Sequence, residues 1–291
     1  MLFSEAVDAY WNDKKKRLRG NTLEGYASAI RRHLMPAWGG MELESITHDE
    51  VQEWVDSLPS YGAAAKAYKT FRQIYRWTLR KHQLRIWDVT QGVELPQAPV
   101  VRRQTLRAAD EQRMLKGIVG QPWEAVVLLE AALGLRRCEA CGVDWSDIDW
   151  RGGWVHIQRG AHWVGGSLIE YGTKTKLSDR WLKLPRWAMA RLRAIRGKRK
   201  AGRVRGDLSP HQIAGRFRRH CRREGLPWVP MTCLRHSWAT ISLEAGAAIE
   251  DVSVALGHST VDTCIRHYLQ SFRTVVGRAS DAYSSAMLSP A

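Results

Sequence analysis

Three side-chain types that suit phosphate chemistry stand close together near the end of the chain. The segment at 232–240, TCLRHSWAT, carries Arg235, and the segment at 256–268, LGHSTVDTCIRHY, carries His258 and Tyr268. An arginine can hold a phosphate through two parallel N–H bonds, and a histidine can hold or move a proton near neutral pH. A tyrosine hydroxyl can attack phosphorus. The combination predicts a nucleophilic site that acts on a phosphodiester.

Two segments further upstream extend this set. ALGLRRCEACGVDWSDIDW adds Arg136 and Glu139, and YGTKTKLSDRWLKLP adds Lys174 in an expected hairpin. Transfer of a phosphodiester passes through a pentavalent state with extra negative charge, which two arginines can stabilise through several N–H donors. Arg136 and Arg235 could serve in this way, although pairing of Arg136 with Glu139 is the structural alternative.

Taken in order, the four segments resemble the catalytic domain of the tyrosine recombinases, also called phage integrases, from about residue 105 to 268. The resemblance implies that Arg136 and Arg235 bind the scissile phosphate and that Glu139 orients the site from behind. It implies that Lys174 protonates the leaving 5′-oxygen, with Lys176 as the competing candidate.

The same resemblance assigns the remaining two positions. His258 would hydrogen-bond the phosphate or assist the nucleophile, against the alternative of a histidine at a helix end. Tyr268 would be the nucleophile, forming a 3′-phosphotyrosyl link and a free 5′-hydroxyl. The bond energy is kept in that link, so the reaction is expected to need no ATP, metal or other cofactor.

Two departures from the family pattern stand out. The family usually has a histidine three residues before its second arginine, where this chain has Thr232. A threonine hydroxyl can donate to a phosphate but does not titrate near neutral pH. The departure is therefore expected to affect the rate of cleavage more than the type of reaction. Tyr268 follows His258 by ten residues, where many relatives have nine, and His267 holds the ninth position.

The charge balance favours a polyanionic partner. The 291 residues include 45 Lys and Arg against 29 Asp and Glu, a net charge of +16. A field of that sign attracts nucleic acid or an acidic membrane surface. The sequence has neither a membrane-spanning apolar stretch nor a secretory leader, so we expect a cytoplasmic protein with no membrane partner. The odd number of cysteines argues against a disulfide framework, and Cys138 and Cys141 are expected to be a structural pair.

The pattern along the chain predicts a mainly α-helical protein with a small antiparallel β-sheet. Residues 1–95 are expected to form a helical domain, which resembles the SAM-like core-DNA-binding domain of the integrases. Residues 96–104, with two prolines, are expected to be a linker. Residues 105–291 are expected to form an α+β catalytic domain with a C-terminal tail, and no further arm-binding module is expected.

Within the first domain, a capping box of Thr47 and Glu50 should start one helix. The segment at 63–84 should be a helix with Tyr68, Phe71, Tyr75 and Leu79 inward. In the second domain, segments at 152–160, 167–174 and 180–185 are expected to be three strands of one sheet. A helix from about 209 should turn Ile213, Phe217 and Cys221 inward.

Basic side chains gather at three places where DNA contact is expected rather than a solvated surface alone. They are Lys69, Arg72, Arg76 and Arg80 on one helix face, Arg102 and Arg103 in the linker, and Arg218, Arg219, Arg222 and Arg223 on a later helix.

The function expected from the resemblance is site-specific recombination of double-stranded DNA by a homotetramer. The chain would be an integrase of a phage or other mobile element, with accessory bending or excision factors as possible partners. A recombinase that resolves chromosome dimers is the alternative with the same chemistry. A DNA-binding relative without catalysis and a type IB topoisomerase are alternatives of other classes.

Overall fold

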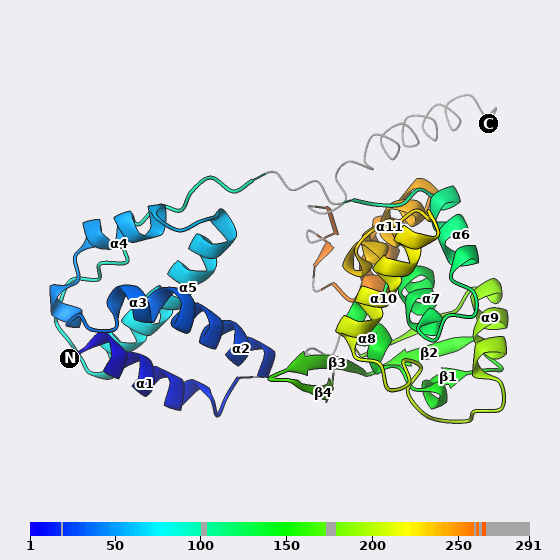
Figure 1. Ribbon diagram of the computed structural model, residues 1–291, viewed down its shortest axis with the longest axis horizontal. Helices are drawn as coiled ribbons and strands as arrows, with labels where there is room; N and C mark the ends of the chain where they lie inside the picture. Colours follow the sequence, from blue (N-terminus) through cyan, green and yellow to red (C-terminus); the bar gives the residue numbers. More distant parts are fainter. Residues whose placement is uncertain (19, 100–103, 173–178, 259, 262–263, 266–291) are drawn as a thin grey trace, which may run out of the picture. The chain divides into compact units, whose positions relative to one another are not determined.

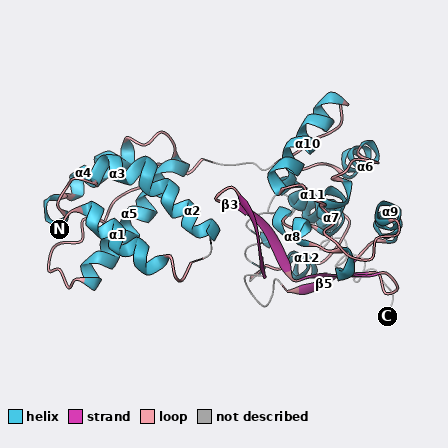
Figure 2. Ribbon diagram, turned by 60° about the horizontal axis from the view of Figure 1, so that its bottom comes forward, coloured by secondary structure: helices cyan, strands magenta, loops and turns pink. Residues whose placement is uncertain are grey.

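The computed structural model describes residues 1–18, 20–99, 104–172, 179–258, 260–261 and 264–265 (Figure 1). The chain divides into two compact units, Met1–Val101 and Arg102–Ala291. Helices predominate in both, and the strands are short and antiparallel (Figure 2). The predicted fold class, mainly α with a small β component, is confirmed.

The N-terminal unit is built from helices alone within the part of the chain that the structure describes. They are α1 (Phe3–Lys14), α2 (Gly20–Ala29), which continues through a π-helical turn (Ile30–Leu34) into α3 (Met35–Trp38), a 3-10 turn (Leu43–Ser45), α4 (His48–Asp56) and α5 (Tyr61–Lys81). The predicted capping box starts α4: the Glu50 carboxylate accepts from the Thr47 backbone N–H at 2.8 Å.

An aromatic cluster holds this unit together. Phe71 of α5 stacks on Phe3 of α1 with ring centroids 5.3 Å apart and on Tyr75 at 5.6 Å. Tyr68, Phe71 and Tyr75 are buried and Leu79 packs against the same cluster, as the helical spacing predicted. Large rings at this spacing supply much of the apolar area that a domain of this size can bury. The opposite face of α5 is left for polar and charged side chains.

The C-terminal unit surrounds one central helix. Its helices are α6 (Ala108–Gly117), α7 (Glu124–Leu133), α8 (Arg137–Gly142), α9 (Arg186–Arg196), α10 (Pro210–Arg223), α11 (Met231–Glu244) and α12 (Ile249–Leu256), with a 3-10 turn at Trp145–Asp147. Every residue of α7 is buried, which its near-continuous run of apolar side chains allows. The ends of α7 are therefore fixed points from which the neighbouring loops start.

The prediction of one sheet built from three segments is wrong. The strands β1 (Ile148–Asp149), β2 (Trp154–Ile157) and β5 (Arg180–Lys183) form one antiparallel sheet, while β3 (Arg159–Val164) and β4 (Ser167–Gly172) form a separate hairpin. Gly165 and Gly166 have positive φ, which closes a two-residue turn and pairs β4 with β3 along its whole length. β4 is thereby held away from β2, whose free edge pairs with β5 instead.

The helix predicted from residue 209 is present as α10. Ser209 and Gln212 form a capping box at its start, and Ile213, Phe217 and Cys221 are buried as expected. Within the described residues, no helix has the length and apolar character needed to cross a bilayer.

Candidate active site

Arg136 is placed by a tight turn at the end of α7. The turn residue Gly134 has φ of +62°, a left-handed conformation that favours glycine. A Cβ built on Gly134 would lie 2.7 Å from the Trp238 side chain and 2.9 Å from that of Leu256, so a larger residue does not fit. The chain then enters α8 with Arg136 as its N-cap residue.

Glu139 lies behind Arg136 and is held by two arginines. Its carboxylate accepts from Nη1 of Arg136 at 2.6 Å, from the Arg136 backbone N–H at 3.0 Å and from Nη2 of Arg180 at 3.1 Å. Burial alone would raise the pKa of Glu139, but Arg180 and Arg136 outweigh it and hold the pKa below its usual value. Glu139 is therefore an anion that orients both guanidinium groups.

Arg235 projects from α11 into the interior and is only 8% exposed. Its Nη1 donates to the Gly134 carbonyl at 2.9 Å and its Nη2 to the Leu256 carbonyl at 2.7 Å. These carbonyls stand at the C-terminal ends of α7 and α12, where backbone acceptors lack a helical partner. Arg235 thus ties the two helix ends to each other.

His258 is placed by the way α12 ends. Gly257 adopts a left-handed conformation, and its N–H donates to the Val254 carbonyl at 2.9 Å. The His258 N–H donates to the Ser253 carbonyl at 3.1 Å. This pair of bonds is a Schellman motif, which fixes the first residue after the glycine relative to the helix.

The fold brings Arg136, Glu139, Arg235 and His258 together at one place. Nη2 of Arg136 donates to the Gly257 carbonyl at 3.4 Å, next to the carbonyl that Arg235 contacts. Four candidates from separate segments of the sequence therefore meet around the end of α12. The other two catalytic candidates, Lys174 and Tyr268, and the linker residues Arg102 and Arg103 lie outside the described residues.

The structure also shows the surroundings of Thr232 and of Cys141. Thr232 is exposed in the first turn of α11, three residues before Arg235. Cys141 is buried, and burial raises its pKa to about 12, so its thiol stays protonated. Among the residues that the structure describes, no group of three or more His, Cys, Asp or Glu side chains is arranged to hold a metal ion.

Arg180 is a member of this cluster that the sequence analysis did not propose. Its side chain is 9% exposed, and its Nε donates to the Ala255 carbonyl at 2.8 Å. A signal was present in the sequence: alternation along β5 turns Leu182 inward and therefore turns Arg180 inward as well. A buried arginine requires an acidic partner, which Glu139 supplies.

The basic stripe predicted on α5 is divided in the structure. Lys69, Arg72 and Arg80 are exposed. Arg76 is half-buried, and its Nε donates to Asp88 at 2.7 Å and to the Thr90 hydroxyl at 3.1 Å. Asp88 comes from the segment after α5, which periodicity within the helix could not reveal. Arg76 is therefore engaged within the unit, and three cations of the stripe face solvent.

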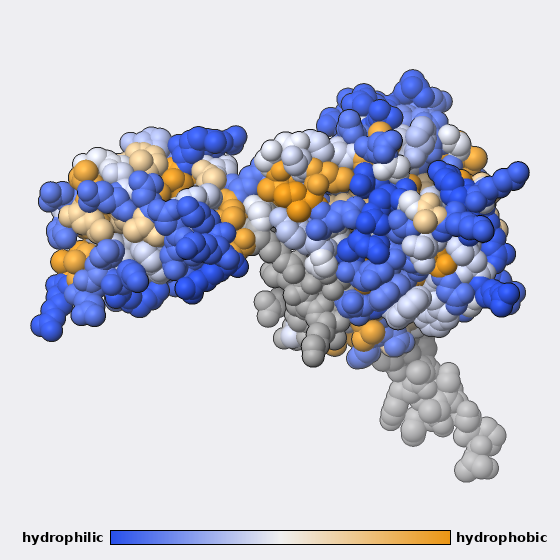
Figure 3. Space-filling model, turned by 90° about the horizontal axis from the view of Figure 1, so that it is seen from below, coloured by the Kyte–Doolittle hydropathy of each residue, from blue (hydrophilic) through white to orange (hydrophobic). Residues whose placement is uncertain are grey.

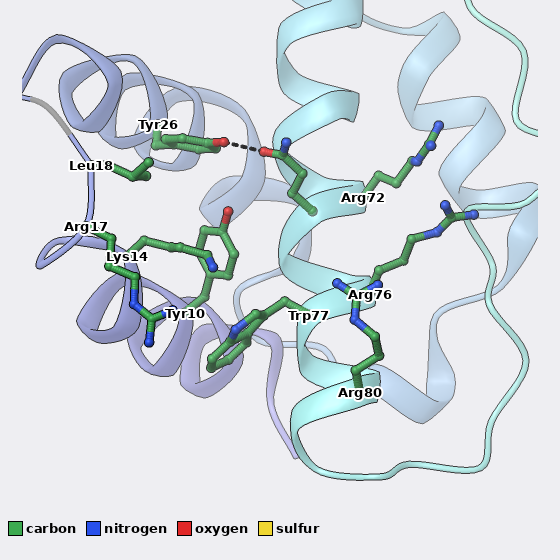
Figure 4. A pocket seen from close by; sticks show the side chains of 10 residues that line it. Tyr10, Lys14, Arg17, Leu18, Tyr26, Arg72, Arg76, Trp77 and Arg80 are labelled. Atoms are coloured by element: carbon green, nitrogen blue, oxygen red, sulfur yellow. Dashed lines mark hydrogen bonds between the residues drawn. The ribbon is translucent and has the colours of Figure 1, made fainter. Parts of the chain in front are cut away.

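Beside this stripe lies a hollow of about 530 Å³ between the α1–α2 region and α5 (Figure 4). Tyr10, Tyr26 and Trp77 contribute its aromatic lining. Its cations are Lys14, Arg17, Arg72, Arg76 and Arg80. Charge and aromatic rings together suit an anionic, partly planar partner such as a nucleic acid.

The four predicted arginines of α10 are all exposed. Arg223 donates to Glu224 at 2.8 Å, and the guanidinium of Arg218 lies 5.8 Å from the centre of the Trp228 ring. Figure 3 shows hydrophilic side chains over much of the visible surface of the C-terminal unit, with smaller apolar patches between them. The four exposed arginines of α10 are groups that can contact phosphates.

Comparison with known proteins identifies both units. Residues 2–58 match the N-terminal SAM-like domain of phage integrases, and residues 105–274 match the phage integrase family. Tyrosine recombinase XerD of Pseudomonas aeruginosa is 27% identical over 285 residues, covering 90% of this chain and 90% of the relative. A putative prophage phiRv2 integrase of Mycobacterium tuberculosis is 22% identical over 270 residues, covering 87% and 71%.

Solved structures show the same fold. The Tn1549 transposon integrase in complex with transposon right end DNA superposes with a TM-score of 0.80 at 16% identity, covering 96% of this chain and all of that one. A lambda integrase tetramer bound to a Holliday junction gives a TM-score of 0.70 at 18% identity, covering 92% and 77%. The family match spans more than half of the sequence and includes Arg136, Arg235 and His258. The chain belongs to the phage integrase family, the tyrosine recombinases.

Proposed function

We propose that this chain is a site-specific DNA recombinase that cuts and rejoins DNA through a 3′-phosphotyrosyl intermediate. The observation that carries the proposal is the meeting of Arg136, Arg235 and His258 at the end of α12, with Glu139 anionic behind them. Cationic donors fixed in advance around one point suit a pentavalent phosphate, because they need no rearrangement as negative charge develops.

In the proposed reaction the phosphoryl group moves from the 5′-oxygen of DNA to the tyrosine oxygen. The Tyr268 oxygen bonds to phosphorus while the bond from phosphorus to the 5′-oxygen breaks. In the proposed scheme His258 receives the tyrosine proton, and Lys174 gives a proton to the departing 5′-oxygen. Thr232, exposed one turn before Arg235, offers a hydroxyl donor at the phosphate. Rejoining reverses these steps with the 5′-hydroxyl of another strand, and neither ATP nor a metal enters the balance.

The basic surfaces would hold the duplex. Lys69, Arg72 and Arg80 of α5 and the exposed arginines of α10 are the contacts to phosphate that we propose, together with Arg102 and Arg103. A homotetramer on paired sites is the proposed active form, as in the lambda integrase tetramer bound to a Holliday junction. The proposed place of action is the cytoplasm, where bacterial DNA lies.

The proposed biological role is integration of a phage or other mobile element. Relatives named as prophage and transposon integrases support it, while relatives named XerC and XerD support the alternative of a housekeeping recombinase. Recovery of a site from random-sequence duplexes by binding, followed by comparison with the DNA next to the gene, separates the two. Attachment repeats flanking the gene would support integration, and a site elsewhere on the chromosome would support the alternative.

Covalent trapping tests the chemistry. Duplexes carrying the selected site, each nicked at a different phosphate, release a short strand after cleavage and so trap the enzyme on DNA. We expect a protein–DNA adduct with the parent chain. A chain that binds the site but never forms an adduct would be a DNA-binding relative. Relaxation of plasmids that lack the site would indicate a topoisomerase.

A further inference from the structure

Three arginines donate to backbone carbonyls at the C-terminal end of α12. They come from the N-cap of α8, from β5 and from α11, and the three carbonyls are successive in the chain. The bonds are Arg180 Nε to Ala255 O at 2.8 Å, Arg235 Nη2 to Leu256 O at 2.7 Å and Arg136 Nη2 to Gly257 O at 3.4 Å. The last carbonyls of a helix carry partial negative charge and lack helical donors, so cations bind there readily. His258 is the next residue in the chain.

Glu139 joins two of these arginines to each other. Its Oε1 accepts from Arg136 and its Oε2 from Arg180, so the single carboxylate lies between the two guanidinium groups. Arg136 is 39% exposed at the side chain, whereas Arg180 is 9% exposed. The exposed member can contact a substrate, whereas the buried member is largely covered by protein.

We propose that Arg180 is a positioning residue of the recombinase. Arg180 holds Glu139, and through it Arg136, in a fixed position relative to the end of α12. The inference rests on the function proposed above and adds to it a residue that acts through another. Without Arg180 the Glu139 carboxylate keeps only the bonds from Arg136, from its backbone N–H and its Nη1, and loses its link to β5. Glu139 is then free to turn away, and Arg136 with it.

An arginine suits this position better than a lysine. Its planar fork reaches Glu139 with Nη2 while Nε is directed to the Ala255 carbonyl, so one rigid group fixes two elements. An ammonium group would restore the charge but could not keep both bonds in the same geometry. A displacement of about 1 Å in a group that contacts the reacting phosphate can slow a reaction by about 10²-fold.

The test compares Arg180→Gln and Arg180→Lys with the parent in single-turnover cleavage of the nicked duplexes, well below each variant's melting temperature. We expect Arg180→Gln to cleave about 10²-fold more slowly, with DNA affinity close to that of the parent, and Arg180→Lys to recover part of the loss. Arg159→Gln is the matched control. Arg159 also pairs with a buried carboxylate, that of Asp147, but it contacts none of the residues at the end of α12 in the described structure. Its loss should lower stability and leave cleavage near the parent rate.

A double-mutant cycle separates positioning from a general structural role. If Arg180 acts through Glu139, adding Arg180→Gln to Glu139→Gln should slow cleavage little beyond the slower single variant. Losses that multiply in full would overturn the inference. So would an Arg180→Gln variant that cleaves at the parent rate while the parent forms adduct normally. Failure of the parent to form any adduct would instead overturn the proposed function, and this inference with it.

Discussion

Arg136 and Arg235 have the same proposed role, binding of the scissile phosphate, but they differ in how deeply they are buried. Arg136 keeps 39% of its side chain exposed, whereas Arg235 as a residue is 8% exposed and is bonded to the ends of two helices. The two arginines should therefore differ in what their removal does to folding. Both were identified from the sequence through the family resemblance, and their catalytic roles remain predictions.

Alanine at either arginine should slow cleavage by about 10²-fold or more, because each removes a donor to the charged transition state. DNA affinity should change much less, since many other cations remain. Arg235→Ala should also lower the melting temperature, because it leaves the buried Gly134 and Leu256 carbonyls without their donor. Single-turnover cleavage, equilibrium binding and thermal melting of both variants check this. Equal losses in binding and cleavage would indicate that the arginines only hold the duplex.

Thr232 gives a second test at this scale. Thr232→Val removes the hydroxyl donor while keeping the shape, and should slow cleavage. Thr232→His should be tolerated, because the position is exposed in the first turn of α11 and has room for a ring. Single-turnover cleavage by Thr232→His and by the parent is compared across about pH 5.5–8.5, where an added imidazole with a pKa of about 6.5 would add a pH dependence. A Thr232→Val variant as fast as the parent at every pH would remove Thr232 from the site.

At the scale of elements, helices were predictable where one stripe is buried, as in α5 and α10, because local spacing decides which face turns inward. The pairing of strands was missed. The Gly165–Gly166 turn is a local signal for the β3–β4 hairpin, whereas the pairing of β5 with β2 joins strands that do not follow each other in the chain and has no local signal. The alternation along β5 indicates that Arg180 turns inward, but it does not identify the partners of Arg180, which are 41 and 75 residues away in the sequence. Contacts over such separations depend on the fold rather than on a local pattern.

The central helix α7 carries a feature with a measurable consequence. Glu130 is fully buried, and neither carboxylate oxygen has a hydrogen-bond partner within the described structure. Burial raises the pKa of Glu130 well above its usual 4.5, although the charges of Arg137 and Arg235 oppose the shift. The folded state therefore binds a proton that the unfolded chain releases. The stability that this neutral carboxyl contributes is complete below pH 4.5 and is lost as the pH rises.

Glu130→Gln should therefore melt at nearly the same temperature as the parent at pH 4.5 and increasingly above it toward pH 8. The amide cannot ionise, so its contribution does not fall with pH. Melting curves of both proteins over this range test the prediction. Glu224→Gln is the control, because the hydrogen bond from Arg223 lowers the pKa of this exposed carboxylate, and the variant's melting temperature should not rise relative to that of the parent toward pH 8. A constant difference between Glu130→Gln and the parent would mean that Glu130 does not change its charge on folding.

At the scale of the whole molecule, the charge is unevenly divided. Residues 1–95 carry 14 basic and 12 acidic side chains, whereas residues 96–291 carry 31 and 17. The C-terminal unit therefore supplies most of the attraction for DNA, and the N-terminal unit contributes through particular faces such as that of α5. Binding should weaken steeply with salt, because each phosphate contact releases a counterion.

Combined replacement of Lys69, Arg72 and Arg80 by Gln should reduce the slope of log affinity against log salt by roughly 2–3, at about 0.9 for each phosphate. Arg76→Gln alone should change the slope little and lower stability instead, because Arg76 is engaged with Asp88. Binding isotherms over a series of salt concentrations give both slopes. An unchanged slope in the triple variant would mean that this face of α5 is solvated rather than bound to DNA.

The central claim is that one tyrosine of this chain becomes covalently joined to DNA, and its most direct measurement is the identity of the joined residue. The parent chain is trapped on the nicked duplex, the DNA is digested to a short remnant, and the modified peptide is sequenced by mass spectrometry, with Tyr268→Phe as the matched variant. The account predicts a remnant on Tyr268 through a 3′-phosphate, and a Tyr268→Phe protein that binds the site but forms no adduct. A remnant on Tyr283, or an adduct that persists in Tyr268→Phe, would contradict it.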